Sequence, residues 1–195
     1  MKRLFDIIVS ILILIPFSIV GIFFSIAILI ESRGGVFYRQ ERIGKNGIPF
    51  KIFKFRTMKL NADKAGTLTV GMRDPRITRI GIILRKLKLD EFPQFLNVLL
   101  GQMSIVGPRP EVKEYVDLYS SEQRKVLNVK PGITDYASLE YFNENELLGA
   151  SNNPRETYIN EIMPAKLELN KKYLANPTLG QDLKIMWKTF LKMVN

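Results

Sequence analysis

The sequence predicts a membrane-associated α+β protein that is mainly helical, and three observations lead to this class. A long apolar run near the N-terminus has the length of a membrane segment. Two later segments have the spacing of basic amphipathic helices, and two apolar segments flank an Asn-Gly pair in the manner of a β-hairpin.

The apolar run extends from Ile7 to Ile30 without an ionisable side chain. It is longer than the ~20 residues that cross a bilayer as a helix. It is also longer than the ~7 to 15 residues of the apolar part of a signal peptide, and no small-residue cleavage site follows it. We therefore expect a membrane anchor that is retained, over residues 1–33.

The topology of this anchor depends on Pro16 and on the flanking charges. Proline lacks a backbone N–H and clashes with the preceding turn, so a helix should break or kink at this point. Lys2 and Arg3 precede the run and Arg33 follows it. Because basic flanks favour the cytoplasmic face, a re-entrant helix-break-helix with both ends on that face fits the sequence. A kinked helix that spans the membrane once is the alternative.

A β-hairpin is predicted directly after the anchor. Residues 36–40 and 48–55 are rich in Val, Ile, Phe and Tyr, and residues 44–47 between them contain an Asn-Gly pair that favours a tight turn. Residues 61–75 contain two glycines and few large apolar side chains, which predicts a mobile loop.

Two basic amphipathic helices are predicted further along the chain. Apolar residues recur at three- and four-residue spacing over residues 77–87, with basic residues around them, and a second such helix begins at about Leu179. Trp187, the single tryptophan, suits the depth of lipid head groups. We expect both helices to lie at a membrane interface, and core helices with a solvated basic face are the alternative. The basic stripe of the last helix consists of Lys184, Lys188 and Lys192.

The composition restricts the chemistry. The chain of 195 residues contains no cysteine and no histidine, which excludes disulfides, a thiolate nucleophile and an imidazole base. Catalysis would therefore use carboxylates, Lys, Arg, Tyr or hydroxyl groups. With 29 Lys and Arg against 19 Asp and Glu, the formal charge is +10, so anionic partners are expected: nucleic acid, acidic lipids or phosphorylated substrates.

The strongest candidate site is the acidic pair Asp90 and Glu91. We expect Asp90 to be a helix N-cap with Glu91 in the first turn, where the positive end of the helix favours ionised carboxylates and can also receive phosphate. Arg85 precedes the pair, and Arg109 follows in a Gly-Pro-Arg-Pro segment whose prolines restrict the backbone. Such arginines suit a diphosphate, and two carboxylates beside them could hold Mg²⁺. Simple helix capping is the alternative for the acidic pair.

Several motifs in a fixed order resemble the bacterial sugar transferases, the small monotopic phosphoglycosyl transferases that act on polyprenyl phosphate. The resemblance covers nearly the whole chain. The motifs are Val36-Phe37-Tyr38-Arg39-Gln40, Phe53-Lys54-Phe55-Arg56-Thr57-Met58, Leu89-Asp90-Glu91, Asn97-Val98-Leu99, Met103-Ser104-Ile105-Val106-Gly107-Pro108-Arg109-Pro110 and Lys130-Pro131-Gly132-Ile133-Thr134.

The resemblance implies transfer of a sugar 1-phosphate from a UDP-sugar to undecaprenyl phosphate, with release of UMP and a requirement for Mg²⁺. Asp90 would then be the nucleophile that forms a phosphosugar-aspartyl intermediate, and Glu91 would orient the metal or handle protons. Arg85 and Arg109, with Arg56 and Lys130, would contact the phosphates. An ionised carboxylate needs no partner base, which agrees with a chain that lacks histidine.

The resemblance also implies a place in the cell. The transferase would begin the synthesis of capsule, O-antigen or exopolysaccharide at the bacterial inner membrane, with residues 34–195 as a catalytic domain on the cytoplasmic face, next to anionic lipids. Residues 135–146 depart from the family pattern and are expected to bear on the sugar that is accepted. The alternative from another class is a membrane-tethered basic protein that binds nucleic acid or acidic lipid; for the transferase we expect no nucleic-acid partner.

Overall fold

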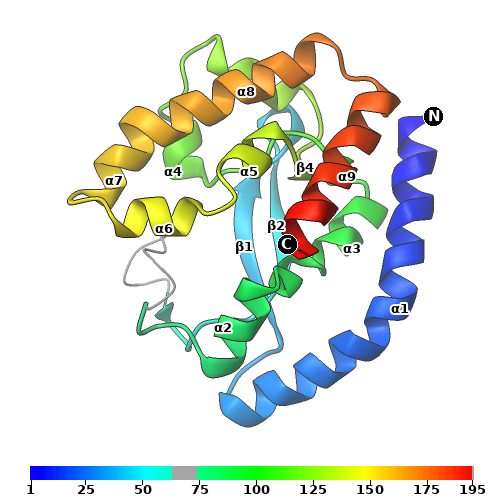
Figure 1. The fold of residues 1–195 in the computed structure, drawn as a ribbon, viewed down its shortest axis with the longest axis vertical. Helices are drawn as coiled ribbons and strands as arrows, with labels where there is room; N and C mark the ends of the chain where they lie inside the picture. The colour runs from blue at the N-terminus through cyan, green and yellow to red at the C-terminus, as the bar shows by residue number, and fades with distance from the viewer. Residues whose placement is uncertain (63–73, 195) are drawn as a thin grey trace.

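The computed structural model describes residues 1–62 and 74–194. Helices dominate and the strands form two small sheets, which confirms the predicted α+β, mainly α class. Figure 1 shows α1 along one side of the molecule, with the other helices around the central strands. Most of the loop predicted over residues 61–75 lies outside the described residues. The helices and strands are α1 (Lys2–Glu31), β1 (Phe37–Ile43), η1 (Lys45–Gly47), β2 (Pro49–Phe55), α2 (Arg79–Lys86), η3 (Leu89–Glu91), α3 (Gln94–Leu99), β3 (Ser104–Val106), α4 (Lys113–Val116), η4 (Gln123–Asn128), β4 (Gly132–Thr134), α5 (Tyr136–Glu140), α6 (Glu144–Gly149), α7 (Pro154–Thr157), η5 (Tyr158–Ile162), α8 (Met163–Ala175) and α9 (Leu179–Val194).

The predicted anchor is one helix. α1 continues through Pro16 and changes direction about halfway along, so the structure has a bend and not a complete break (Figure 1). A proline removes a single N–H from the helical ladder, and such a loss can be absorbed by a kink. Close to the bend, the Ser18 hydroxyl donates to the Ile15 carbonyl oxygen at 2.7 Å.

The surface of α1 is unlike that of a core helix. Within the described residues, α1 is the one helix long and apolar enough to cross a membrane, and 11% of its most apolar stretch is buried inside the molecule. Large side chains such as Ile15, Ile19 and Phe23 are exposed. An exposed apolar surface of this length requires an apolar environment outside the protein.

Polar contacts fasten the N-terminal end of α1 to the rest of the molecule. Lys2 lies 2.5 Å from the Asp182 carboxylate of α9. Asp6 is 3% exposed and accepts a hydrogen bond from the Ser104 hydroxyl at 2.8 Å, which ties the helix to β3. Arg3 donates to the Leu99 carbonyl oxygen at the end of α3. A buried carboxylate in an apolar helix is costly unless it is hydrogen-bonded, so these contacts define how α1 packs.

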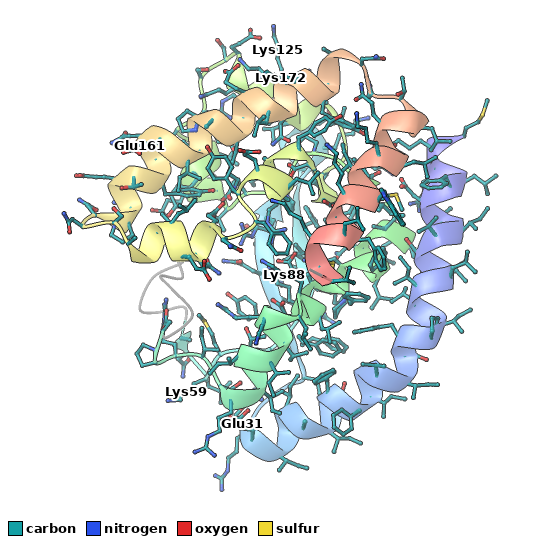
Figure 2. The ribbon with its side chains drawn as sticks, in the orientation of Figure 1. Glu31, Lys59, Lys88, Lys125, Glu161 and Lys172 are labelled. Atoms are coloured by element: carbon teal, nitrogen blue, oxygen red, sulfur yellow. The ribbon has the colours of Figure 1, made fainter. Side chains whose placement is uncertain are left out.

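The C-terminal end of α1 is fastened to the same body. The Glu31 carboxylate accepts the backbone N–H groups of Arg79 and Ile80 at 2.6 and 2.8 Å, at the N-terminus of α2. An acidic group at this end of a helix satisfies amides that lack helical partners. Figure 2 shows Glu31 at the junction between α1 and α2. Both ends of α1 are therefore attached to one compact domain.

The predicted hairpin is confirmed. β1 pairs with β2 in antiparallel register, from Phe37 opposite Phe55 to Ile43 opposite Pro49. The turn between them contains Asn46 with φ 57° and Gly47 with φ 76°. These left-handed conformations are the ones for which an Asn-Gly pair is favoured.

Both predicted amphipathic helices are present as α2 and α9. The Thr78 hydroxyl caps α2 by accepting the Gly81 N–H at 2.9 Å. In α9, Ile185 is fully buried while Trp187 is 61% exposed, so apolar side chains lie on both the inner and the outer face. The outer faces of α2 and α9 agree with a location at a membrane interface.

A second small sheet holds the Gly-Pro-Arg-Pro segment. β3 pairs with β4 in parallel, with Ser104 opposite Gly132 and Val106 opposite Thr134. A Cβ atom on Gly132 would lie 2.1 Å from the backbone nitrogen of Gly107, so the two chains approach as closely as glycine permits. This contact fixes the start of the segment over residues 107–110.

Candidate active site

The acidic pair lies in a single turn of 3-10 helix between α2 and α3. Lys88 has φ 55°, and this left-handed residue separates α2 from the turn η3 that contains Asp90 and Glu91. The expectation that Asp90 is a helix N-cap is wrong, because Pro93 precedes the first residue of α3 and Asp90 caps no helix. A non-glycine residue in this conformation is often found at a functional site, where the surrounding structure compensates for the strain.

Glu91 is neutralised by two basic side chains. Arg109 binds both carboxylate oxygens, with its Nη1 3.0 Å from Oε2 and its Nη2 bound to Oε1. Lys54 of β2 donates to Oε1 at 2.7 Å. Burial alone would raise the pKa of Glu91, but Arg109 and Lys54 hold the pKa well below its usual range. Glu91 is consequently a fixed negative charge that orients two cations.

Asp90 has the opposite surroundings. Its residue is 8% exposed, and its carboxylate makes no hydrogen bond to the residues that the structure describes. Burial raises the pKa of Asp90, and the charge of Glu91 raises it further, against the lowering effects of Lys54, Arg85 and Arg109. A desolvated carboxylate that is not held by a hydrogen bond is free to react or to bind a ligand.

The backbone around Arg109 determines where its guanidinium lies. The Arg109 N–H donates to the Asp135 carboxylate at 3.1 Å, and the Gly132 N–H donates to the Pro108 carbonyl oxygen at 2.9 Å. Asp135 is fully buried and also accepts the Ser138 N–H at 2.6 Å, at the start of α5. The loop that carries Arg109 is thus held between β4 and α5.

Arg85 approaches the acidic pair from α2. Its Nε donates to the Thr57 hydroxyl at 2.9 Å, and no hydrogen bond from its two terminal nitrogens is found in residues 1–62 and 74–194. Burial lowers the pKa of Arg85, while the charge of Asp90 raises it. The guanidinium remains charged at neutral pH and can offer two donors to an anion.

These side chains line one end of a cavity of about 690 Å³. Its volume falls in the ~300–1,000 Å³ range of small-molecule sites. Its lining includes the acidic pair together with Lys54, Arg85, Lys88 and Arg109, which we call the polar end, and apolar side chains of α1, α3 and α9, which we call the apolar end. The hydroxyls of Thr134 and Thr189 also line the cavity. Figure 2 shows Lys88 beside the C-terminal end of α9, facing this space.

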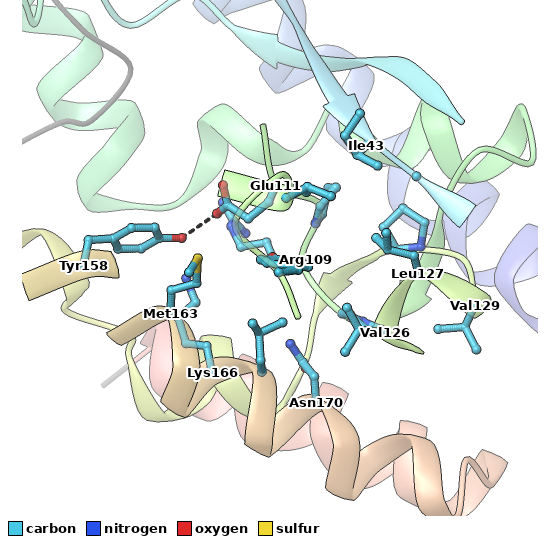
Figure 3. Close-up of a pocket in the computed structure, with 17 residues that line it drawn as sticks. Ile43, Arg109, Glu111, Val126, Leu127, Val129, Tyr158, Met163, Lys166 and Asn170 are labelled. Atoms are coloured by element: carbon cyan, nitrogen blue, oxygen red, sulfur yellow. Dashed lines mark hydrogen bonds between the residues drawn. The ribbon is translucent and has the colours of Figure 1, made fainter. Parts of the chain in front are cut away.

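A second cavity lies on the other side of the Arg109 loop and is much smaller. Figure 3 shows its walls, which include Ile43, Tyr158 and Lys166. With a volume of about 30 Å³ it can hold only one or two water molecules. The Tyr158 hydroxyl donates to Glu111 at 2.6 Å beside it, so this region supports the loop and does not accommodate a substrate.

Two of the sequence-predicted phosphate ligands are not among the residues that line the large cavity. The Arg56 guanidinium donates to the carbonyl oxygens of Ser32 and Arg33, at 2.7 and 2.8 Å, where α1 ends. Lys130 is close to Arg3, and burial together with that positive charge lowers the pKa of Lys130. The structure brings together Asp90, Glu91, Arg85 and Arg109 from the predicted set, and it places Arg56 and Lys130 elsewhere.

Lys54 and the α9 residues of the site had no predicted role, and Asp135 was placed only within residues 135–146, which were expected to bear on the sugar that is accepted. Lys54 binds Glu91, and burial lowers the pKa of its ammonium group. A lysine between two phenylalanines in a strand was a usable signal, since a buried ammonium group requires an acidic partner. Asp135 and the α9 residues that line the cavity gave no comparable signal, because their contribution depends on long-range packing.

One carboxylate of the acidic pair is available for a magnesium ion that a substrate would share. No cluster of three or more acidic residues that could hold a metal occurs in the described part of the chain. Glu91 is already bound by Arg109 and Lys54, which leaves the Asp90 carboxylate as the available protein ligand. Mg²⁺ commonly takes one or two carboxylates and completes its shell with substrate phosphates and water, so this donor set is sufficient.

Comparison with known proteins identifies the family of the chain. The sequence model of the family described as Bacterial sugar transferase matches residues 1–195. The chain belongs to the bacterial sugar transferase family. Family membership favours an enzyme over the membrane-tethered binding protein that the sequence left as an alternative.

Three relatives illustrate the range of the family. The chain is 37% identical to the sugar transferase EpsL of Bacillus subtilis (strain 168), over 100% of this chain and 87% of EpsL. It is 39% identical to a UDP-glucose:undecaprenyl-phosphate glucose-1-phosphate transferase of Klebsiella pneumoniae, over 98% of this chain and 39% of that protein. It is 35% identical to a UDP-N-acetylgalactosamine-undecaprenyl-phosphate N-acetylgalactosaminephosphotransferase of Aeromonas hydrophila, over 96% of this chain and 42% of that protein. The chain thus spans less than half the length of the latter two relatives.

Proposed function

We propose that the protein transfers a sugar 1-phosphate from a UDP-sugar to undecaprenyl phosphate, releases UMP, and thereby begins synthesis of a membrane-associated glycan such as capsule, O-antigen or exopolysaccharide. The observation that carries this proposal is the buried carboxylate of Asp90, which accepts no hydrogen bond from the described residues and lies among Lys54, Arg85 and Arg109 in a cavity that also has apolar walls. A reaction that transfers a group from a soluble phosphorylated donor to a lipid acceptor would use both the charged and the apolar side chains of this cavity. Family membership and the activities for which the relatives are named support the same reaction class.

The transfer proceeds in two displacements. An Asp90 oxygen attacks the sugar-bearing phosphorus of the UDP-sugar, the bond to the bridging oxygen breaks, and UMP leaves with that oxygen. This step produces a mixed anhydride between Asp90 and the sugar phosphate. A phosphate oxygen of undecaprenyl phosphate then attacks the same phosphorus, and the carboxylate is released. The product is undecaprenyl diphosphate sugar, so atoms and charge balance without a further reactant.

The charged side chains around Asp90 have different proposed roles. Arg109 holds Glu91 through a two-pronged contact and would keep its remaining donors near the phosphates, and Arg85 would offer its two terminal nitrogens, which bind none of the described residues. These groups stabilise the negative charge that develops on the phosphoryl oxygens. Glu91 keeps Lys54 and Arg109 in position, because both are bound to its carboxylate. Asp90 and the donor diphosphate would hold a Mg²⁺ ion, which neutralises phosphate charge when bound.

The anchor is proposed to be re-entrant, with both ends on the cytoplasmic face of the inner membrane. Lys2 and Asp6 tie one end of α1 to the domain, and Glu31 ties the other end to it. A helix that crossed the bilayer would have ends on opposite faces, and a single compact domain could not bind both. The basic stripe of α9 would meet anionic lipids of that leaflet.

Single cysteines test this topology, since the chain contains none of its own. Lys2→Cys and Gly35→Cys should both react with a membrane-impermeant thiol reagent from the cytoplasmic side of inverted vesicles. Labelling of the two positions from opposite sides would exclude the re-entrant anchor.

The reaction is tested with purified protein in lipid nanodiscs that contain undecaprenyl phosphate. A panel of UDP-sugars with Mg²⁺ should release UMP with at least one donor. With acceptor withheld, label from the sugar phosphate should stay on the protein. If UMP is released only when acceptor is present and no label stays on the protein, the sugar phosphate is transferred directly and the covalent route is wrong. If no donor leads to UMP release, the proposed function is wrong.

A further inference from the structure

The apolar end of the large cavity has a composition that the donor substrate does not explain. Its walls include Ile13 of α1, Phe92 and Phe95 near η3 and α3, and Phe190 and Met193 of α9. These side chains offer a nucleotide or a sugar no hydrogen bonds in exchange for those that it makes with water. An apolar ligand loses nothing there and gains by leaving water.

Three residues at the C-terminal end of α9 are both walls of the cavity and part of the outer surface. Phe190, Met193 and Val194 line the cavity, yet they are 54%, 36% and 61% exposed. They therefore form the edge where the cavity meets the outside. The outer face of α9 continues from this edge through other exposed apolar side chains, including Leu183 and Trp187.

We propose that the apolar end, between Ile13 of α1 and Phe190 and Met193 of α9, holds the first isoprene units of the polyprenyl phosphate acceptor. This inference rests on the proposed function and adds the residues that select the lipid. The wall is continuous with the cationic end, so a chain that enters over α9 brings its phosphate toward Asp90 and Arg85. One wall is supplied by α1 itself, the helix whose outer surface requires an apolar environment.

The position of α9 is secured by contacts other than these apolar side chains. Lys192 donates to the Leu139 carbonyl oxygen at 2.6 Å, and the hydroxyls of Thr189 and Thr134 lie 2.7 Å apart. Ile185 is fully buried beneath the helix. Truncation of the partly exposed Phe190 or Met193 should therefore alter the cavity edge without displacing α9.

The test compares the two half-reactions in Phe190→Ala and Met193→Ala. The donor half is followed by exchange of labelled UMP into the UDP-sugar without acceptor, and the acceptor half by kcat/KM for undecaprenyl phosphate and for a two-isoprene phosphate. Leu183→Ala and Leu191→Ala are the matched controls, since both side chains are exposed on α9 and neither lines the cavity.

We expect UMP exchange within twofold of the wild type in all four variants. The kcat/KM for undecaprenyl phosphate should fall about tenfold in the two cavity variants, the size expected from losing contact with one large apolar side chain, and Phe190→Leu should restore most of it. The controls should stay near the wild-type value. Equal losses in cavity and control variants, or a loss of exchange as well, would show that α9 only supports the fold or the membrane contact and would overturn the inference.

A second measurement does not depend on activity. Because the chain has no cysteine, Met193→Cys and Leu183→Cys can each carry a photoreactive thiol reagent. Cross-linking to labelled polyprenyl phosphate should favour position 193 severalfold and should fall when unlabelled undecaprenyl phosphate is added. Equal cross-linking at both positions would contradict the subsite. Failure of wild-type protein to exchange UMP would instead count against the covalent route of the proposed function.

Discussion

Asp90 and Glu91 are adjacent in the chain, but their carboxylates lie in opposite surroundings. Both Glu91 oxygens are bound, by Arg109 and Lys54, and these charges hold the pKa of Glu91 well below its usual range. Asp90 is 8% exposed and has no hydrogen bond among the described residues, and burial raises its pKa. One turn of helix thus holds a carboxylate that is bound by two cations and, next to it, the carboxylate that we propose as the reactive one.

The largest expected effect comes from removing the reactive carboxylate. Asp90→Asn keeps the shape of the side chain and removes the nucleophile, so UMP release and sugar transfer to lipid should both fall by at least about 10³-fold. Labelled nucleotide sugar with undecaprenyl phosphate measures both. Asp117→Asn, on the exposed end of α4, is the control that should keep wild-type activity. Ordinary turnover by Asp90→Asn would remove Asp90 from the mechanism.

Removing the structural charge should have a smaller effect and should change the pH profile. Glu91→Gln releases Lys54 and Arg109, so we expect a loss of about 10²-fold in kcat/KM. Asp90 must be ionised to attack, so activity falls as the pH drops through its raised pKa. Glu91 contributes to that rise, and Glu91→Gln should move the acidic limb of the profile to lower pH. A limb that stays in place would show that the two carboxylates are not coupled.

A substitution that keeps the charge and changes only the hydrogen-bonding geometry should reduce kcat/KM less than Glu91→Gln does. Arg109→Lys keeps one positive charge but loses the two-pronged contact with Glu91, and about a tenfold loss in kcat/KM for the UDP-sugar is expected. Initial rates over a range of donor concentrations measure this loss. Arg124→Lys, at an exposed position of η4 that does not line the cavity, should be neutral, and an equal loss in both variants would point to a general effect on folding.

The smallest expected effect is on stability, and its sign differs between the two acids. A carboxyl group with a raised folded-state pKa destabilises the fold when ionised, so Asp90→Asn should raise the free energy of unfolding at pH 7 by about 1 kcal/mol. Glu91 has a lowered pKa and stabilises the fold above about pH 4.3, with the contribution lost as the pH falls further. Glu91→Gln should therefore lower the thermal midpoint at pH 7. Shifts of the same sign in both variants would contradict the comparison.

Much of the fold follows from local sequence patterns. The Asn46-Gly47 pair specified the hairpin, and apolar spacing specified α2 and α9, because these signals act over a few residues. The N-cap expectation for Asp90 failed because a left-handed Lys88 starts a separate turn, and nothing in the side chain of a lysine indicates that conformation.

Some of the predicted site residues lie in the cavity and others do not, and this difference has a physical reason. Asp90, Glu91 and Arg85 are close in sequence, and Arg109 reaches them through a loop with distinctive glycine and prolines. Arg56 has the same charge as these arginines, but its partners are carbonyl oxygens at the end of α1. Distance along the chain does not distinguish an arginine that binds phosphate from one that binds the end of a helix. The part of the cavity wall that α9 supplies depends on how distant elements pack.

The attachment of both ends of α1 to one domain has a consequence for the bilayer. In the proposed topology the bent helix enters a single leaflet and occupies area there, while the opposite leaflet receives none. The protein therefore acts as a wedge, and its insertion is easier where the lipids of the cytoplasmic leaflet are loosely packed. Lateral pressure in the membrane, in addition to the supply of substrates, then contributes to where the enzyme is active.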